Sequence, residues 1–372
     1  MWRKLVAMMR FDGPGGKTRP LKANPLKIRP ASEGSPLAEA SFAPNPGNLR
    51  MFQYLPQDLK AGAPLVVALH GCGQTAGGYD LGAGWCQLAD RFGFAVLAAE
   101  QKAVNNPNTC FDWFNPEDIT RGEGEACSIA AMIGAMVEAR GLDAGRVFIT
   151  GLSAGGAMAA VMLATYPELF AGGAIIAGLP FGAAQDVRDA LESMRSARLR
   201  TPAQWGEAVR AASDYGGPWP RISIWHGALD TTVNVNNAQA SMAQWADLHG
   251  LSLADAKQEV VDGAIRLHWG ERLEVYTLPL LGHGTPIDSN DLGEPGPFIL
   301  EAGISSSRRI AEFWGLAPAI LSRPVPKPVP VEPKHPALPE IEAALLPERT
   351  VAQPRLENVI LRALRAAGLI RR

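Results

Sequence analysis

The 372-residue chain is predicted to adopt an α/β fold, in which helices cover both faces of a mostly parallel sheet. Three observations predict this fold. Strand-like apolar runs alternate with helix-prone stretches between residues 45 and 316. The run Leu65–Leu69 is apolar throughout, as expected of a strand buried on both faces. The pentapeptide Gly151–Gly155 lies between a strand-like run and a helix-like run.

The elements follow in order along this central region. Strands are expected near residues 65–69, 94–98, 146–150, 172–177, 221–225 and 272–278. Helices are expected near residues 85–92, 126–140, 154–165, 237–249 and 302–314. Residues 183–218 are expected to form a helical insertion, with helices over 186–198 and 201–213. The insertion is either a mobile wall of a pocket or a pair of packing helices.

Three segments that flank the centre differ from it in composition. Residues 1–44 are basic and rich in proline and glycine, which predicts an arm that is either a solvated tail or, less favoured, a contact to an anionic surface. Residues 317–350 carry regularly spaced prolines and are expected to form an extended linker. Residues 351–372 show the spacing of a basic amphipathic helix. That helix packs on the body or on a second subunit, binds a partner or a surface, or is disordered when alone.

Composition limits the class of protein. Apolar residues make up 47% and charged residues 19% of the chain, enough for a large core. A formal net charge of −2 gives no overall attraction to nucleic acid or to an anionic membrane. No apolar run approaches the roughly 20 residues that span a bilayer, and residues 5–9 are too short an apolar run for a signal peptide. We therefore expect a cytoplasmic protein.

The motif G-x-S-x-G is the most informative local pattern. In a strand–turn–helix context, Gly151-Leu152-Ser153-Ala154-Gly155 is typical of a nucleophile elbow. Small residues around Ser153 would let the strand and the helix pass closely and hold its Oγ at the sheet edge. We expect Ser153 to be a nucleophile; the alternative is a glycine-rich loop in which Ser153 caps the helix.

A nucleophilic serine needs a base, and the base needs an acid that orients it. In α/β-hydrolases the acid and then the histidine follow the serine along the chain, each after a strand. Asp230 comes just after the strand-like run 221–225, and His283 lies in a glycine-flanked loop after the run 273–278. The order therefore predicts Ser153, Asp230 and His283 as a catalytic triad.

Other histidines and carboxylates compete for these two roles. Four other histidines have simpler explanations than the role of the base. His226 belongs to a strand-end turn and His249 ends a helix, where a cation suits the helix dipole. His268 comes before the last strand and His335 lies in the proline-rich tail. The rival acids are Asp262 and Asp288, for which a turn-forming or solvated aspartate is the other interpretation.

An acyl-transfer site also needs two backbone N–H groups that bind the oxyanion. Ala154, directly after the serine, is expected to supply one of them. The strand 65–69 opens into His70-Gly71-Cys72-Gly73-Gln74, where the glycines let the loop turn its amides toward a substrate. We expect the Cys72 N–H to be the second donor; the alternative is a glycine turn without a catalytic role.

Several motifs in this order resemble the poly(3-hydroxybutyrate) depolymerase family of esterases. They are His70–Gln74, Leu88–Phe94, Cys110–Phe114, Arg121–Glu125, Gly151–Met158, Tyr166-Pro167, Gly303–Ser306 and Phe313–Leu316, and the match covers roughly residues 45–316. The resemblance implies the α/β-hydrolase fold that the family shares with feruloyl and acetylxylan esterases, and a serine carboxylesterase with the triad named above. It also allows a disulfide between Cys72 and Cys110, which in the cytosol would stay reduced.

Two departures from the family pattern affect the substrate. Family members commonly have Cys-Trp where this chain has Cys110-Phe111. Secreted depolymerases carry a signal peptide and often a polymer-binding domain, and neither is evident in the sequence. Degradation of an extracellular crystalline polymer is therefore not the expectation.

The sequence is least informative about the substrate pocket. Trp113, Phe114, Trp225 and Leu179 adjoin expected catalytic-face positions and either line an apolar pocket or pack in the core. Arg121 is the nearest cation to those loops. The chemistry requires no metal or cofactor. We expect an esterase for short hydroxyalkanoate esters or oligomers, with feruloyl or acetylxylan ester hydrolysis and a non-catalytic scaffold role as alternatives.

Overall fold

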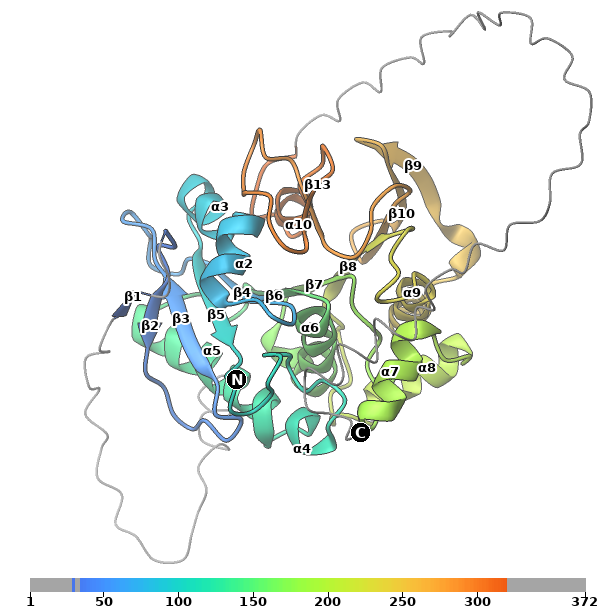
Figure 1. Cartoon of the computed structure of the whole chain (residues 1–372), viewed down its shortest axis with the longest axis horizontal. Coiled ribbons are helices and arrows are strands. Elements are labelled where there is room, and N and C mark those ends of the chain that lie inside the picture. The colour runs from blue at the N-terminus through green and yellow to red at the C-terminus, as the bar shows by residue number, and fades with distance from the viewer. Residues whose placement is uncertain (1–28, 31–33, 320–372) are drawn as a thin grey trace, which may run out of the picture. The chain divides into compact units, whose positions relative to one another are not determined.

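The computed structural model describes residues 29–30 and 34–319 (Figure 1). Most of the expected N-terminal arm, nearly all of the proline-rich linker, the expected C-terminal helix and His335 lie outside the described residues. Within the described part of the chain, no helix is both long and apolar enough to cross a membrane.

Among the described residues, one sheet of 11 strands organises the fold in the order β1-β2-β3-β5-β4-β6-β7-β8-β11-β10-β9. Its centre is parallel and consists of β5 (Ala95–Glu100), β4 (Leu65–Leu69), β6 (Val147–Leu152), β7 (Gly172–Ile176), β8 (Arg221–Gly227) and β11 (Leu273–Leu278). Antiparallel strands extend both edges: β1 (Arg29–Pro30), β2 (Ala38–Ala40) and β3 (Arg50–Tyr54) on one side, β9 (Lys257–Val261) and β10 (Ala264–Trp269) on the other. β12 (Thr285–Ile287) and β13 (Ile299–Glu301) form a separate parallel pair.

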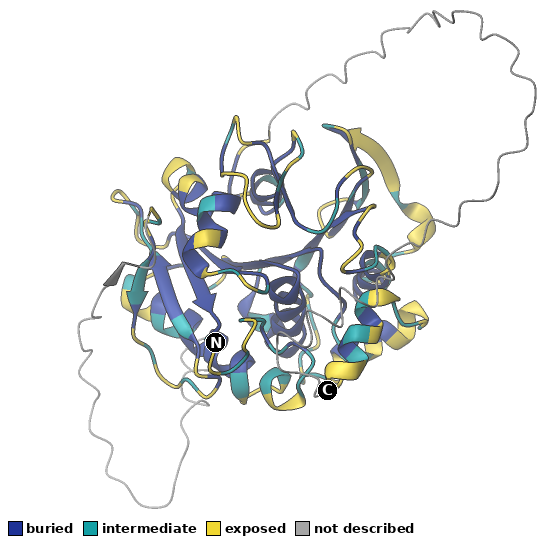
Figure 2. Ribbon diagram, in the orientation of Figure 1, coloured by how far each residue is buried: buried dark blue, intermediate teal, exposed yellow. Residues whose placement is uncertain are grey.

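Helices cover both faces of this sheet, which is why its central strands are apolar on both sides. One core contains residues of α5 (Gly124–Arg140), α6 (Ala154–Thr165) and α9 (Asn236–Leu248). The other contains residues of α2 (Ala76–Ala83), α3 (Trp85–Phe92) and α10 (Ser306–Phe313). Val67 belongs to the first core and its neighbours Val66 and Ala68 to the second, as strand alternation requires. The dark central strands of Figure 2 show this two-sided burial.

The predicted core elements agree with the structure. All six expected strands form, and β4 has the predicted bounds. The last helix is shorter than expected, because Gly303 has a φ of +67° and Ser305 caps α10 by accepting a hydrogen bond from the N–H of Arg308. The expected α/β class, with a largely parallel sheet, is confirmed.

The insertion forms two helices, α7 (Val187–Arg195) and α8 (Pro202–Arg210). Asp186 and Thr201 cap them by accepting hydrogen bonds from N–H groups in the first turns, so each predicted start falls on a cap residue. The structure differs at the N-terminal side of the domain. Residues 38–40, placed in the arm by the sequence, form β2 and pair with β3. The sheet therefore extends beyond the expected start at residue 45.

Candidate active site

Ser153 occupies the tight turn between β6 and α6. Its φ of +56° and ψ of −115° are strained for a residue with a side chain. The turn is held by a 2.8 Å hydrogen bond from the Ser153 N–H to the Ile176 carbonyl. Gly155 abuts the end of β4: a Cβ at Gly155 would collide with the carbonyl oxygens of Leu69 and His70. The motif is thus a strained elbow that only small residues permit.

Asp230 and His283 lie in loops at the carboxyl ends of β8 and β11, which are parallel neighbours. Two backbone hydrogen bonds of 2.9 Å join these loops, from Ala228 N–H to the Leu278 carbonyl and from Leu229 N–H to the Leu281 carbonyl. Gly227 lets the loops approach, because a Cβ there would collide with the carbonyls at positions 281 and 282. Strand order therefore brings together side chains that are far apart in the sequence.

The three side chains form a hydrogen-bonded chain. Ser153 Oγ lies 2.9 Å from His283 Nε2, and His283 Nδ1 lies 2.7 Å from Asp230 Oδ2. Because Asp230 accepts the hydrogen of Nδ1, Nε2 is left as the acceptor that faces the hydroxyl. The side chain of Asp230 is completely buried and that of His283 is 8% exposed. This arrangement can withdraw a proton from the serine hydroxyl.

The Asp230 carboxylate is ionised although it is buried. Burial would raise its pKa, but hydrogen bonds from His226, His283 and the Val233 N–H hold the pKa well below its usual range. Its Oδ1 accepts hydrogen bonds of 2.8 Å from the N–H groups of Thr232 and Val233. Four donors thus fix both the charge and the orientation of this carboxylate.

The two expected oxyanion donors are free to bind a ligand. In the loop after β4, the N–H of Gly71 donates to Gln74 Oε1 and that of Gly73 to the Asn108 carbonyl. The N–H groups of Cys72 and Ala154 have no acceptor among residues 29–30 and 34–319. The structure therefore leaves unpaired the two amides that the sequence predicts as oxyanion donors.

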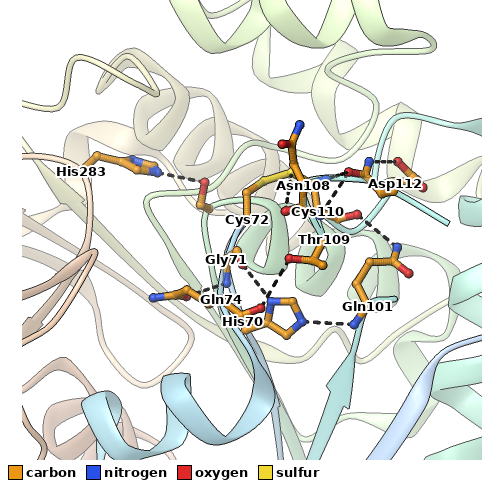
Figure 3. Close-up of a disulfide and its surroundings, with 12 residues drawn as sticks. His70, Gly71, Cys72, Gln74, Gln101, Asn108, Thr109, Cys110, Asp112 and His283 are labelled. Atoms are coloured by element: carbon orange, nitrogen blue, oxygen red, sulfur yellow. Dashed lines mark hydrogen bonds between the residues drawn. A yellow bond between two sulfur atoms is a disulfide. The ribbon is translucent and has the colours of Figure 1, made fainter. Parts of the chain in front are cut away.

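A disulfide joins Cys72 to Cys110, the pair that the family resemblance allowed (Figure 3). The loop that carries Cys110 is held in turn by Gln101, whose Nε2 donates to the Cys110 carbonyl at 3.1 Å. The Gln101 N–H also donates to His70 Nε2 at 3.1 Å. Burial lowers the pKa of His70 to about 4, so this histidine is neutral and serves to support the loop.

Three carboxylates have oxygens within 4.8 Å of one another: Asp112, Asp118 and Glu125. Each accepts hydrogen bonds from neighbours, among them Asn106 to Asp112 and Asn115 to Asp118. Burial raises the pKa of all three. These groups are the ones that could hold a cation in the described part of the chain, but their oxygens already bind protein donors.

Of the two interpretations of the expected pocket residues, pocket lining or core packing, burial favours core packing for Trp225 and Leu179. Trp225 is fully buried on β8 and stacks on Tyr276 with ring centroids 3.8 Å apart. Leu179 is 1% exposed and belongs to the core. Trp113 is buried against the half-buried Phe114, so of the four only Phe114 retains appreciable exposure.

The competing histidines and acids and the nearby cation lie on other elements or have other partners. His249 Nε2 contacts the Pro220 carbonyl, His268 lies on β10, Asp262 pairs with Arg309, and Asp288 accepts a hydrogen bond from the Asn290 N–H. Arg121 pairs with Glu168 at 2.6 Å and lies over the Tyr166 ring. His226 differs from these residues: its Nε2 lies 3.1 Å from Asp230 Oδ2, a contact that its place in the sequence does not predict.

The fold and the site together are those of an α/β-hydrolase-like carboxylic ester hydrolase. Residues 50–266 match the family described as Esterase PHB depolymerase, and the chain belongs to that family.

Similar proteins include a polyhydroxyalkanoate depolymerase and acetylxylan esterases. Poly(3-hydroxyalkanoate) depolymerase C of Paucimonas lemoignei is 42% identical over 287 residues, which cover 74% of this chain and 69% of that protein. An acetylxylan esterase of Coprinopsis cinerea is 36% identical over 66% of this chain and 68% of its own length. The acetyl xylan esterase from Aspergillus awamori superposes with a TM-score of 0.66 at 28% identity, covering 76% of this chain and 99% of that one.

Proposed function

We propose that this protein is a serine carboxylesterase in which Ser153 is the nucleophile, His283 the general base and Asp230 the acid that orients it. The observation that carries the proposal is the continuous hydrogen-bonded chain of 2.9 and 2.7 Å through these side chains. His283 Nε2 takes the proton of Ser153 Oγ as the oxygen attacks an ester carbonyl. The proton then passes to the leaving alcohol as the ester C–O bond breaks, which leaves the acyl group on Ser153. His283 next takes a proton from water, which attacks this acyl-enzyme and releases the acid and the free serine.

The oxyanion is held by the N–H groups of Cys72 and Ala154. Both are unpaired among the described residues; the first belongs to the loop after β4 and the second to the start of α6, directly after the serine. Each such donor contributes about 3–4 kcal/mol to transition-state stabilisation in related chemistry. The disulfide at Cys72 fixes the position of the first donor.

The proposed substrates are short hydroxyalkanoate esters or oligomers. The poly(3-hydroxyalkanoate) depolymerase of Paucimonas lemoignei, 42% identical to this chain, supports this class. Acetylxylan ester hydrolysis is the second candidate, supported by the 33–36% identity to fungal acetylxylan esterases and by the superposition on one of them. The intact hydrogen-bonded site argues against a scaffold without catalysis.

Parallel assays test both parts of the proposal. Hydrolysis of p-nitrophenyl butyrate, a soluble 3-hydroxybutyrate oligomer, acetylated xylan and methyl ferulate would be compared for the wild type and Ser153→Ala. We expect turnover that Ser153→Ala abolishes, with kcat/KM highest for the oligomer. Equal turnover by Ser153→Ala would refute the mechanism. A higher kcat/KM for acetylated xylan or methyl ferulate would refute the substrate class and leave the mechanism intact.

A further inference from the structure

His226 contacts the same carboxylate oxygen of Asp230, Oδ2, as His283 does. It follows the apolar part of β8 and precedes the acid by four residues, with a side chain only 1% exposed. Its Nε2 faces two oxygens, Asp230 Oδ2 at 3.1 Å and the Val233 carbonyl at 2.9 Å. Both oxygens are acceptors, so Nε2 carries the hydrogen and shares it between them.

The Asp230 carboxylate is consequently saturated with donors. Oδ1 accepts from the Thr232 and Val233 amides, and Oδ2 accepts from two imidazoles, those of His226 and His283. The carboxylate has no exposed surface from which water could replace a lost donor. The histidine that shares Oδ2 with His283 therefore limits how the carboxylate can rotate and how strongly it attracts the imidazolium that forms on His283.

We propose that His226 is a positioning residue that holds Asp230 in register with His283, which extends the triad to a chain of four side chains. The inference rests on the proposed esterase mechanism. His226 acts only through Asp230: it orients the carboxylate and shares its charge. The titratable groups that face Asp230 in the described structure are these two histidines.

Two substitutions separate positioning from simple packing. His226→Leu removes the N–H donor. His226→Gln keeps one, because the glutamine Nε2 is as many bonds from Cβ as the histidine Nε2 is. With p-nitrophenyl butyrate, we expect His226→Leu to lower kcat about 10- to 100-fold with little change in KM, because small misplacements of a catalytic group cost this much. His226→Gln should stay within a few-fold of the wild type.

The pH profile adds a readout that a packing role would not move. Without the His226 donor, Asp230 interacts more strongly with the His283 imidazolium, so the acid limb of kcat/KM should move to higher pH in His226→Leu but not in His226→Gln. His249→Leu is the matched control, since it removes a similar contact between Nε2 and a backbone carbonyl away from the site. It should change neither kcat nor the profile.

Proton NMR tests the contact without turnover, and so remains decisive if the esterase assay fails. The low-field resonance of the hydrogen between His283 Nδ1 and Asp230 should shift in His226→Leu and remain in His226→Gln. If His226→Leu does not fold, His226→Asn replaces it, because its amide falls short of the Nε2 position. The proposal would be overturned if the variant that lacks the donor kept the resonance, kcat and pH profile of the wild type. It would also be overturned if His226→Gln did not restore them.

Discussion

Replacing Ser153 should reveal the strain stored in the elbow. The residue has a φ of +56°, where a side chain is disfavoured and glycine is not. Such backbone strain costs about 1–3 kcal/mol, whereas glycine loses about 0.5–1 kcal/mol relative to alanine through the entropy of the unfolded chain. Ser153→Ala keeps the strain and Ser153→Gly relieves it, and both remove the hydroxyl. We therefore expect Ser153→Gly to be about 1 kcal/mol more stable than Ser153→Ala, by the difference of these two effects.

Urea unfolding and calorimetry measure this difference directly. For a domain of about 150–250 residues, an increase of about 1 kcal/mol in the free energy of unfolding raises Tm by about 2–4 °C. Ser241 provides the control, because it is a fully buried serine inside the helix α9. There the order should reverse, with glycine about 1 kcal/mol less stable than alanine. Equal or lower stability of Ser153→Gly relative to Ser153→Ala would refute the strain argument.

Three further perturbations test other parts of the site. Gly155→Ala places a Cβ against two backbone carbonyls at the end of β4 and should lower kcat at least 10²-fold. Gly216→Ala is the control: a Cβ there meets nothing within 4 Å, so kcat should be unchanged. Replacing both Cys72 and Cys110 by serine should lower the free energy of unfolding by about 2–4 kcal/mol, seen as a lower urea midpoint, and should lower kcat because the oxyanion loop loosens; an unchanged kcat would contradict that role of the bond. His70 has a folded pKa of about 4 against 6.5 when unfolded, so the unfolded state binds more protons between these values. Stability should therefore fall by up to about 3 kcal/mol as pH decreases from 6.5 to 4, and His70→Gln should flatten this dependence.

The central strands could be predicted from the sequence because they are buried on both faces and are therefore apolar throughout. A continuous apolar run such as Leu65–Leu69 has few interpretations in a chain of this length, and glycines mark the ends of α3 and α5. The edge strands lacked such a signal. β9 has four exposed residues, and β2 is three residues long. Their pairing depends on the neighbouring strand more than on their own composition.

The sequence left open whether the aromatic residue before the acid loop lines a pocket or packs in the core. Trp225 precedes the acid loop, so the sequence places it close to the site along the chain. The strand alternates its side chains, however, and the ring of Trp225 points into the layer that contains Tyr276. Chain proximity to a catalytic loop therefore did not predict which face a large aromatic residue would occupy.

The sequence by itself determined the class of fold, the elbow serine and the order of the residues that follow it, because these depend on local patterns of apolar spacing and small residues. Only the tertiary structure decided which side chains meet. Parallel pairing of β8 with β11 brings Asp230 to His283, which is 53 residues further along the chain. The same packing places His226 on Asp230, since burial leaves its Nε2 no acceptor but the acid and one carbonyl. Hydrogen-bond partners in a buried site are set by three-dimensional packing, which no local pattern in the sequence specifies.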